Sequence, residues 1–334
     1  MPKPKVSGPF LAAGLATVVL VVSTVWSAGS GTGTATAREF LDGRQLRIMA
    51  PAAPGGGWDQ TAREMQSALR DVVGRTEVYN VAGAGGTVGL SQYTRYKGRP
   101  TELMVMGLVM VGAIESNDAP VTLAQTTPLA RLVTDYEIVV VPTNSPVTSM
   151  ADLVNRMRAN LGSVSFAGGS AGGVEQILTG LIGRGIGADP AKVTYVAHSG
   201  GGEALTTVLS GRATAAVSGV SELLPQVKAG NMRALAVSSA ERLPALPDVP
   251  TLRESGVDVE LANWRAVVAP AGISAADEAA LEELILEMTR TGAWRDALDR
   301  RGWSDAALAG AEFDAFIESE QRRIAQIIDD MGLG

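Results

Sequence analysis

Residues 46–89 read LRIMAPAAPGGGWDQTAREMQSALRDVVGRTEVYNVAGAGGTVG, and this stretch decides the fold class. A short apolar strand is expected over 46–50, followed by a turn. A helix is expected over 61–73, where apolar residues recur at helical spacing. A second strand over 77–81 leads into the glycine-rich residues 83–89 and another short helix. Strand, helix and strand in this order predict a parallel βαβ unit of an α/β fold.

The alternation of strands and helices continues along the chain and predicts a second α/β unit after the first. Further strands are expected over 103–106, 138–141, 164–167, 193–196, 213–218 and 234–238. Further helices are expected over 150–160 and 174–184, after Gly202 as far as 209, and over 274–288, 294–301 and 313–331. Ser274 and Asp277 have the spacing of a capping box, which opens the helix over 274–288.

The composition excludes several classes of function. The 334 residues carry a net charge of −7, so the chain offers no general attraction for nucleic acid. It has no cysteine and a single histidine, His198, which excludes disulfides, thiolate sites and histidine-rich metal centres. We therefore expect no metal, no cofactor and no nucleic-acid partner.

The first 37 residues have the features of an export signal. Lys3 and Lys5 precede an apolar run over 10–26, and Ala35-Thr36-Ala37 offers a small-residue cleavage site. The alternatives are an uncleaved membrane anchor and a buried core helix. With a signal peptide or an anchor, the folded part is exported to the periplasm or the cell surface, in the second case tethered there.

Four strand-to-helix turns are rich in glycine: Pro54–Gly57, Gly83–Gly86, Gly168–Gly173 and Gly200–Gly202. Ligands of open α/β sheets bind at the carboxyl ends of strands, where such turns gather. Free backbone N–H groups at the start of a helix bind anions. Together the four turns predict an anion site for a carboxylate, phosphate or sulfate. For any one of them, a plain tight turn is the alternative.

Two motifs resemble enzyme signatures without completing them. Residues 83–89 have glycines spaced G-x-G-x-x-x-G, unlike the dinucleotide fingerprint, and the next strand ends in Met106-Gly107-Leu108 without the expected acidic residue. Residues 197–201 resemble a hydrolase nucleophile elbow, but the chain's one histidine, His198, is adjacent to Ser199 itself. We therefore expect no catalytic residues and do not expect an enzyme.

Several segments together resemble one family. They are IMAPAAPGGGWDQTAR (48–63), NVAGAGG (80–86), VKAGNMRALAV (227–237), LPDVPT (246–251), and Trp264 with APAG (269–272). In this order they resemble the substrate-binding proteins of tripartite tricarboxylate transporters, also called TctC or Bug-type receptors. The resemblance covers the chain from about residue 44 to its end.

The resemblance implies a two-lobed, type II periplasmic-binding-protein-like fold with the ligand cleft between the lobes. Lobe 1 would hold 41–137 plus 265–334, and lobe 2 would hold 138–264, with crossings near Val139 and Trp264. The implied function is capture of a small carboxylate and its delivery to a membrane permease, by a receptor that we expect to be monomeric. The alternatives are a ligand sensor for a signalling partner and an α/β enzyme acting on a carboxylate.

The motifs and turns together give the expected ligand-binding residues. They are Pro54, Gly55, Gly56, Gly57, Trp58, Asp59, Ala84, Gly85, Gly86, Thr87, Leu108, Val109, Gly168, Gly169, Ser170, Gly172, Gly173, His198, Gly200, Ser218 and Trp264. Three of them have structural alternatives: Asp59 as a favourable charge at a helix start, His198 as a turn residue, and Trp264 as hinge packing. Arg131 could pair with a ligand carboxylate, but an ion pair within the protein is the preferred interpretation.

The chain departs from the family pattern at several of these positions. Leu108, Val109 and Met110 are apolar where the family has small polar residues. In and just after the third glycine turn, Gly173, Val174 and Gln176 stand where the family has Thr-Ser and a following His, and Ser218 stands where it has Asp. Trp58 could form an aromatic wall. These departures suggest the hypothesis of a ligand less hydrophilic than citrate, such as an aromatic or branched carboxylate.

Overall fold

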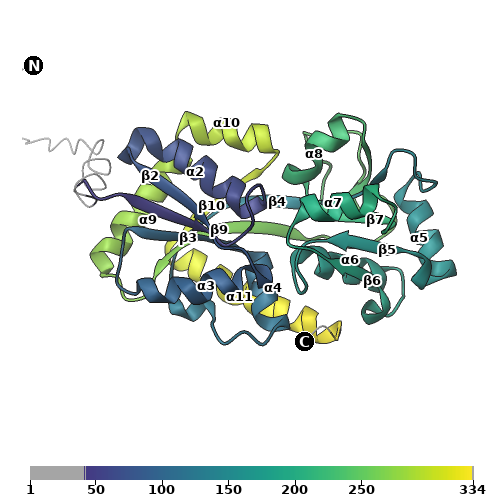
Figure 1. Ribbon diagram of the computed structural model, residues 1–334, viewed down its shortest axis with the longest axis horizontal. Helices are drawn as coiled ribbons and strands as arrows, with labels where there is room; N and C mark the ends of the chain where they lie inside the picture. The colour runs from purple at the N-terminus through teal and green to yellow at the C-terminus, as the bar shows by residue number, and fades with distance from the viewer. Residues whose placement is uncertain (1–40, 42, 333–334) are drawn as a thin grey trace, which may run out of the picture. The chain divides into compact units, whose positions relative to one another are not determined.

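The computed structural model describes residue 41 and residues 43–332 (Figure 1). The export signal expected over 1–37 lies outside the described residues. Within them, no helix combines the length and the apolar character needed to cross a membrane.

The described chain alternates strands and helices, as the sequence predicts. The strands are β1 (Leu46–Ala50), β2 (Thr76–Asn80), β3 (Glu102–Gly107), β4 (Thr126–Pro142), β5 (Ser165–Gly168), β6 (Thr194–Ala197), β7 (Ala215–Gly219), β8 (Met232–Val237), β9 (Ala262–Pro270) and β10 (Ser304–Ala309). The α-helices are α2 (Gly57–Val73), α3 (Thr87–Tyr93), α4 (Leu108–Ser116), α5 (Met150–Ala159), α6 (Val174–Gly185), α7 (Gly201–Leu209), α8 (Val220–Lys228), α9 (Ala275–Thr289), α10 (Gly292–Arg301) and α11 (Gly310–Asp330).

The strands pair along the path β2-β1-β3-β9-β4-β7-β5-β6, and β8 and β10 each pair with β4. The first part of β4 pairs with β9 and β10, and its last residues, from Glu137 to Pro142, pair with β7 and β8. This long strand thus joins two α/β lobes (Figure 1). We call the half built on β1, β2, β3, β9 and β10 lobe 1, and the half built on β5 to β8 lobe 2.

Each lobe contains the parallel pairs that the βαβ pattern predicts. In lobe 1, β1 is parallel to β2 and β3, and in lobe 2, β5 is parallel to β6 and β7. The carboxyl ends of these strands lead into the glycine turns, which places the turns at one edge of each sheet. The capping box at Ser274 and Asp277 is present at the start of α9.

Four elements are absent from the expected pattern: α4, α8, β9 and β10. Strand β4 also starts at Thr126, well before the expected strand over 138–141. The apolar run after β3 forms α4, with Leu108 and Met110 buried. Pro225 lies inside α8, where a proline ordinarily signals the end of a helix.

The C-terminal helix α11 packs against the core by one apolar face. Phe313, Ile324 and Ile328 are buried, but Phe316 and Ile327 are only partly buried and Ile317 takes a core position. The end of α11 reaches α6 of lobe 2, where Arg184 Nη1 lies 3.4 Å from Asp330 Oδ2. The two lobes are therefore also in contact away from β4.

Candidate functional site: a pocket between the lobes

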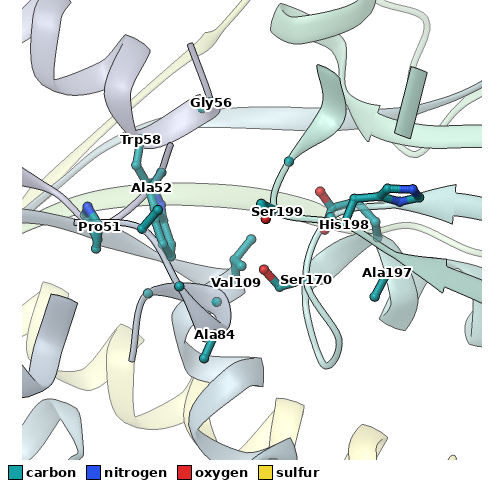
Figure 2. Close-up of a pocket in the computed structure, with 18 of the residues that line it drawn as sticks. Pro51, Ala52, Gly56, Trp58, Ala84, Val109, Ser170, Ala197, His198 and Ser199 are labelled. Carbon is teal, nitrogen blue, oxygen red and sulfur yellow. The ribbon is translucent and has the colours of Figure 1, made fainter. Parts of the chain in front are cut away.

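A cavity of about 430 Å³ lies between the lobes and is lined by residues of both (Figure 2). This volume falls in the range of small-molecule sites. Trp58 from lobe 1 faces Ser170 and Ser199 from lobe 2 across it (Figure 2). Eleven of the expected ligand-binding residues line it: Gly56, Gly57, Trp58, Ala84, Gly85, Gly86, Val109, Gly169, Ser170, His198 and Gly200.

The other expected residues lie outside the lining. They are Pro54, Gly55, Asp59, Thr87, Leu108, Gly168, Gly172, Gly173, Ser218 and Trp264. Trp264 is 1 % exposed, its Nε1 donates to Glu320 Oε2 at 2.8 Å, and its ring meets the edge of Phe316. Its position fits the packing alternative and not a contact with ligand.

Arg131 forms neither the ligand contact nor the preferred ion pair. Its Nε donates to the carbonyl oxygen of Ala306 at 2.8 Å, and its guanidinium lies 4.4 Å from the centre of the Phe316 ring. Burial lowers the pKa of Arg131. No carboxylate of the described residues 43–332 lies within ion-pair distance of it, because β4 turns this side chain toward β10 and α11.

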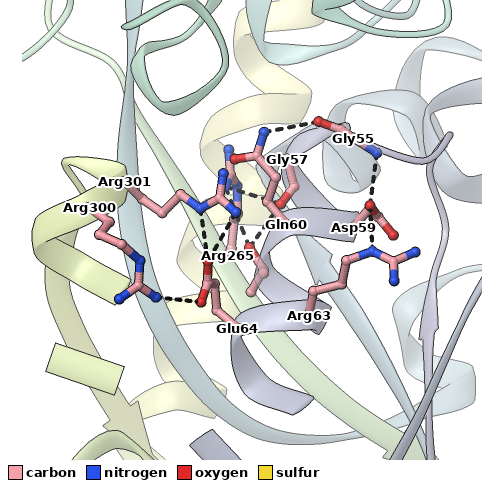
Figure 3. Close-up of polar contacts among 10 residues, drawn as sticks. Gly55, Gly57, Asp59, Gln60, Arg63, Glu64, Arg265, Arg300 and Arg301 are labelled. Atoms are coloured by element: carbon pink, nitrogen blue, oxygen red, sulfur yellow. Dashed lines mark hydrogen bonds and ion pairs between the residues drawn. The ribbon is translucent and has the colours of Figure 1, made fainter. Parts of the chain in front are cut away.

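The first glycine turn is closed by a carboxylate of its own chain. Asp59, in the first turn of α2, accepts hydrogen bonds from Gly55 N at 2.8 Å and Arg63 Nε at 2.9 Å (Figure 3). It also accepts one from Asn80 Nδ2 at 2.9 Å. Burial raises the pKa of Asp59, but these hydrogen bonds outweigh burial and lower it overall. Asp59 thus holds the turn in place and is not free to meet a ligand.

The turn Gly83–Gly86 differs because it carries no acidic residue. Its Ala84 has φ +45°, and Gly85 and Gly86 have φ +59° and +91°. A left-handed alanine is strained, and such strain is held at functional sites by the surrounding packing. A Cβ on Gly86 would lie 2.6 Å from the Trp58 ring, and one on Gly85 would overlap Ala113. The turn is therefore fixed between the indole and α4, with its backbone open to the cavity.

The turns of lobe 2 also hold carboxylates of their own chain. Glu203 in α7 accepts a hydrogen bond from Ser199 N at 3.0 Å. Glu175 in α6 lies against the third glycine turn, where a Cβ on Gly169 would come 2.5 Å from its Oε1. The prediction that all four turns offer free N–H groups to an anion therefore needs correction: three of the four already face an acid from the helix that follows.

Sequence reasoning missed twelve lining residues: Pro51, Ala52, Ala82, Gly83, Ala171, Glu175, Ala197, Ser199, Glu203, Glu222, Asn263 and Arg265. A signal for the acids was present. Glu175, Glu203 and Glu222 each lie in the first turn of the helix that follows a strand-to-helix turn at this edge. Asn263 and Arg265 come from β9, a strand that the sequence analysis did not predict.

Arg265 is the one permanent cation of the lining, and the protein itself occupies it. Its Nη2 lies 2.6 Å from Asp135 Oδ2. Its Nη1 donates to Gly57 O at 3.2 Å, a contact that Figure 3 shows, and to Thr61 Oγ1 at 3.4 Å. Ser221 Oγ donates to the same carboxylate at 2.5 Å. The guanidinium is thereby committed to a buried network at the pocket and offers little to a ligand anion.

Buried acids give the lobe 2 side of the pocket its electrostatic character. Burial raises the pKa of Glu175 to about 7, a rise that hydrogen bonds from the backbone of Glu175 and Gly169 partly oppose. Burial also raises the pKa of Glu222, and that of Glu137 lies well above its usual range for the same reason. Glu137 Oε1 accepts a hydrogen bond from Asn263 Nδ2 at 2.8 Å. These carboxyls share a region with little water and one guanidinium.

His198 reaches the pocket through its backbone, and its ring points away from Ser170 (Figure 2). Nδ1 lies 3.2 Å from Gly168 O and Nε2 lies 2.7 Å from Thr207 Oγ1. The carbonyl can only accept, so Nδ1 carries a proton, and Nε2 pairs with the Thr207 hydroxyl, which can donate or accept. Both ring nitrogens are therefore engaged, and neither can act as a base for Ser199.

Nothing in the described part of the chain indicates a metal site. Within residues 43–332, no three His, Cys, Asp or Glu side chains have the arrangement needed to hold a metal ion.

Comparison with known proteins gives a consistent family. The model of the tripartite tricarboxylate transporter family receptor matches residues 61–333. Protein BugT of Bordetella pertussis is 27% identical over 330 residues, 95% of this chain and 98% of the relative. The structure of R. palustris Rpa4515 with adipate has a TM-score of 0.78 at 22% identity and covers 86% of this chain and 97% of its own. The structure of MatC from Rhodopseudomonas palustris with bound malate has a TM-score of 0.74 at 23% identity, with 85% and 98% covered.

Proposed function

Because the chain belongs to the tripartite tricarboxylate transporter receptor family, we propose that it captures a small carboxylate in the pocket between its lobes and delivers it to a membrane permease. The observation that carries this proposal is the turn Gly83–Gly86. Its strained backbone lines the cavity, and no acidic side chain occupies it. Gly86 N donates to Gly83 O at 2.9 Å and Thr87 N donates to Ala84 O, so the N–H groups of Ala84 and Gly85 are the ones that we propose for the anion.

The remaining lining suits recognition better than catalysis. Trp58 and Val109 supply apolar surface, and Ser170 and Ser199 supply hydroxyls on the opposite side. Neighbouring structures with bound adipate and malate support a carboxylate as the ligand. Both ring nitrogens of His198 have partners within the protein, which speaks against hydrolysis by Ser199. The apolar surface of Trp58 and Val109 also supports the hypothesis of an aromatic or branched carboxylate.

We place the protein outside the cytoplasm, where a receptor of this family meets its ligand before the permease. Lobe closure about the strands that join the lobes would bury the ligand. The boundaries 41–137 plus 265–334 and 138–264 remain our proposal for the two moving bodies. A single binding site also requires no second copy, in keeping with a monomer.

Thermal unfolding of the purified full chain against a panel of carboxylates tests the proposal. The panel includes citrate, malate, adipate, and aromatic and branched acids, with the matching alcohols as controls. A ligand present at 100 times its dissociation constant stabilises the folded state by about 2.7 kcal/mol. A shift with an acid and none with its alcohol supports carboxylate capture. A well-folded protein that responds to no acid contradicts it.

A further inference from the structure

The pocket has an unequal charge distribution that the capture of a carboxylate does not by itself explain. Three carboxyl side chains line it, Glu175, Glu203 and Glu222, against the one guanidinium of Arg265. That guanidinium is already paired with Asp135. A ligand with two or three carboxylates would bring further negative charge against these groups, and like charges in a region of low dielectric repel strongly.

A second, independent observation concerns unsatisfied hydrogen-bond acceptors. Glu175 is 8 % exposed and Asn263 is 6 % exposed, and both line the cavity. Among the described residues, neither Glu175 Oε2 nor Asn263 Oδ1 has a hydrogen-bond partner. Buried polar atoms are ordinarily hydrogen-bonded, and an exception calls for a partner. Asn263 Oδ1 can only accept, and Glu175 Oε2 can only accept while the carboxyl is ionised, so the missing partner of the ionised form is a hydrogen-bond donor.

The two ends of the pocket therefore differ in chemistry. The turn Gly83–Gly86 on lobe 1 presents backbone without an acidic side chain. The side formed by Glu175, Glu222 and Asn263 presents buried carboxyls and unpaired acceptors. A ligand that satisfies both ends has a carboxylate at one end and a charged donor at the other.

We propose that the ligand is a zwitterion with one carboxylate and one protonated amine, an amino acid or a related aminocarboxylate. Its amine is held by N–H hydrogen bonds on the side formed by Glu175, Glu222 and Asn263, and its carboxylate lies at the turn Gly83–Gly86. This inference rests on the proposed function and narrows its ligand class from carboxylates in general to aminocarboxylates.

Paired probes test the inference by isothermal titration calorimetry on the full chain at pH 8. Each pair differs by the amine: phenylalanine with 3-phenylpropanoate, leucine with 4-methylpentanoate, and glutamate with glutarate. In at least one pair, we expect the amino acid to bind about tenfold or more tightly than the acid without the amine. This is the size of effect that hydrogen bonds to a buried charge produce. Tighter binding of the acids without amine overturns the inference and leaves the proposed function standing. Binding of no probe overturns both.

A trimethylated form of the bound amino acid separates hydrogen bonding from charge alone. It keeps the positive charge and has no N–H group. We expect its affinity to fall about tenfold or more, since Glu175 Oε2 and Asn263 Oδ1 then keep no donor. Equal affinity for the trimethylated form overturns the assignment of N–H hydrogen bonds.

The variant Glu175→Gln tests the residue itself, with Glu283→Gln as the matched control. Glu283 is exposed on α9 and lies outside the lining. We expect Glu175→Gln to lower the affinity for the amine at least about tenfold and Glu283→Gln to leave it unchanged. Unfolding without ligand checks that the variant folds. An unchanged affinity in a folded Glu175→Gln variant overturns the inference.

The direction in which affinity changes with pH distinguishes an amine bound to ionised Glu175 from a carboxylate bound to neutral Glu175. The amine needs ionised Glu175, whose pKa burial raises to about 7, so affinity should fall about tenfold from pH 8 to pH 6. A ligand carboxylate that accepts a hydrogen bond from neutral Glu175 would instead bind more tightly at pH 6, and that outcome overturns the inference. The charged or titratable groups that act on Glu175 are Glu222, Arg265, Glu137 and Tyr195.

Discussion

The guanidinium of Arg265 lies 2.6 Å from the carboxylate of Asp135, and both side chains are almost fully buried. Arg265 comes from β9 and Asp135 from β4, and Arg265 Nη1 also reaches Gly57 O at the start of α2. The pair thus ties the strand that joins the lobes to the first helix of lobe 1, beside the pocket. Removing either side chain of a buried ion pair leaves the other charge buried without a partner, and this destabilises the fold.

Removing one member of this pair should destabilise the protein strongly. We expect Arg265→Met to lower the free energy of unfolding by about 3–5 kcal/mol, because Asp135 is then left buried without its cation. Urea unfolding followed by circular dichroism measures the change. The control is Arg184→Met, whose pair with Asp330 is about half exposed and should contribute less than about 1 kcal/mol. Equal effects of the two variants would contradict the structural role of Arg265.

Glu175→Gln should stabilise the protein without ligand at alkaline pH. The pKa of Glu175 is about 7 in the folded protein against an ordinary value of 4.5, so the folded state holds the proton more tightly than the unfolded state. Stability is therefore lost as pH rises from about 4.5 to 7, and the loss persists above pH 7. Glutamine avoids this loss, which is on the order of 3 kcal/mol.

Melting temperatures of Glu175→Gln and the unchanged protein at pH 4.5 and pH 8 check this expectation. The two proteins should melt together at pH 4.5, and the variant should melt higher at pH 8. A variant that melts lower at pH 8 would mean that the ionised carboxylate stabilises the fold. A binding residue that lowers the stability of the empty protein is consistent with a group kept for its ligand.

Gly86→Ala should weaken ligand binding by disturbing the turn beside Trp58. Gly86 has φ +91°, and an added Cβ lies 2.6 Å from the Trp58 ring, so both backbone and indole must shift. We expect a loss of about 1–3 kcal/mol in stability and at least about tenfold in affinity. Gly202→Ala is the control, since its Cβ meets nothing within 4 Å. The chain has five tryptophans, so the emission of Trp58 is obtained as the difference from a Trp58→Phe variant. An unchanged Trp58 signal together with unchanged affinity would contradict this prediction.

The positions of the glycine turns could be predicted from the sequence, but the side chains that face them could not. The glycine turns after β1, β2, β5 and β6 could be predicted, because strand-to-helix turns gather at one edge of a parallel sheet. The acidic side chains that face those turns could not be predicted. Whether an acid such as Asp59 or Glu175 turns toward its own loop or toward solvent depends on neighbours such as Asn80 and Gly169.

The residues of β9 show that the sequence does not determine which side chains of a strand face the pocket. Trp264 was expected at the ligand, yet its neighbours in sequence, Asn263 and Arg265, line the pocket. Successive side chains of a strand point to opposite faces of a sheet, so a shift of one residue exchanges the two sets. A motif match could find the strand's position in the chain, but the pairing of β9 with β3 and β4 decides which face meets the cavity.

The lobes are in close contact where Gly112 of α4 meets Gly172 of the third glycine turn. A Cβ on Gly112 would overlap the carbonyl oxygen of Gly172, and a Cβ on Gly172 would overlap Ser116. Gly112 belongs to lobe 1 and Gly172 to the third glycine turn in lobe 2, so an alanine at 112 cannot coexist with the present spacing of the lobes. The backbone carbonyl cannot rotate away as a side chain would, and the added methyl must push the turn outward.

We therefore expect Gly112→Ala to hold the lobes further apart, with faster dissociation of ligand and little change in its association. Alanine is a better helix former than glycine, so helix propensity alone would favour the variant. Small-angle scattering of the ligand-bound protein should show a larger radius of gyration, and stopped-flow measurement should show the faster dissociation. Gly162→Ala is the control, because its nearest contact is at 3.5 Å. Unchanged dissociation in Gly112→Ala would mean that the bound state does not use this contact.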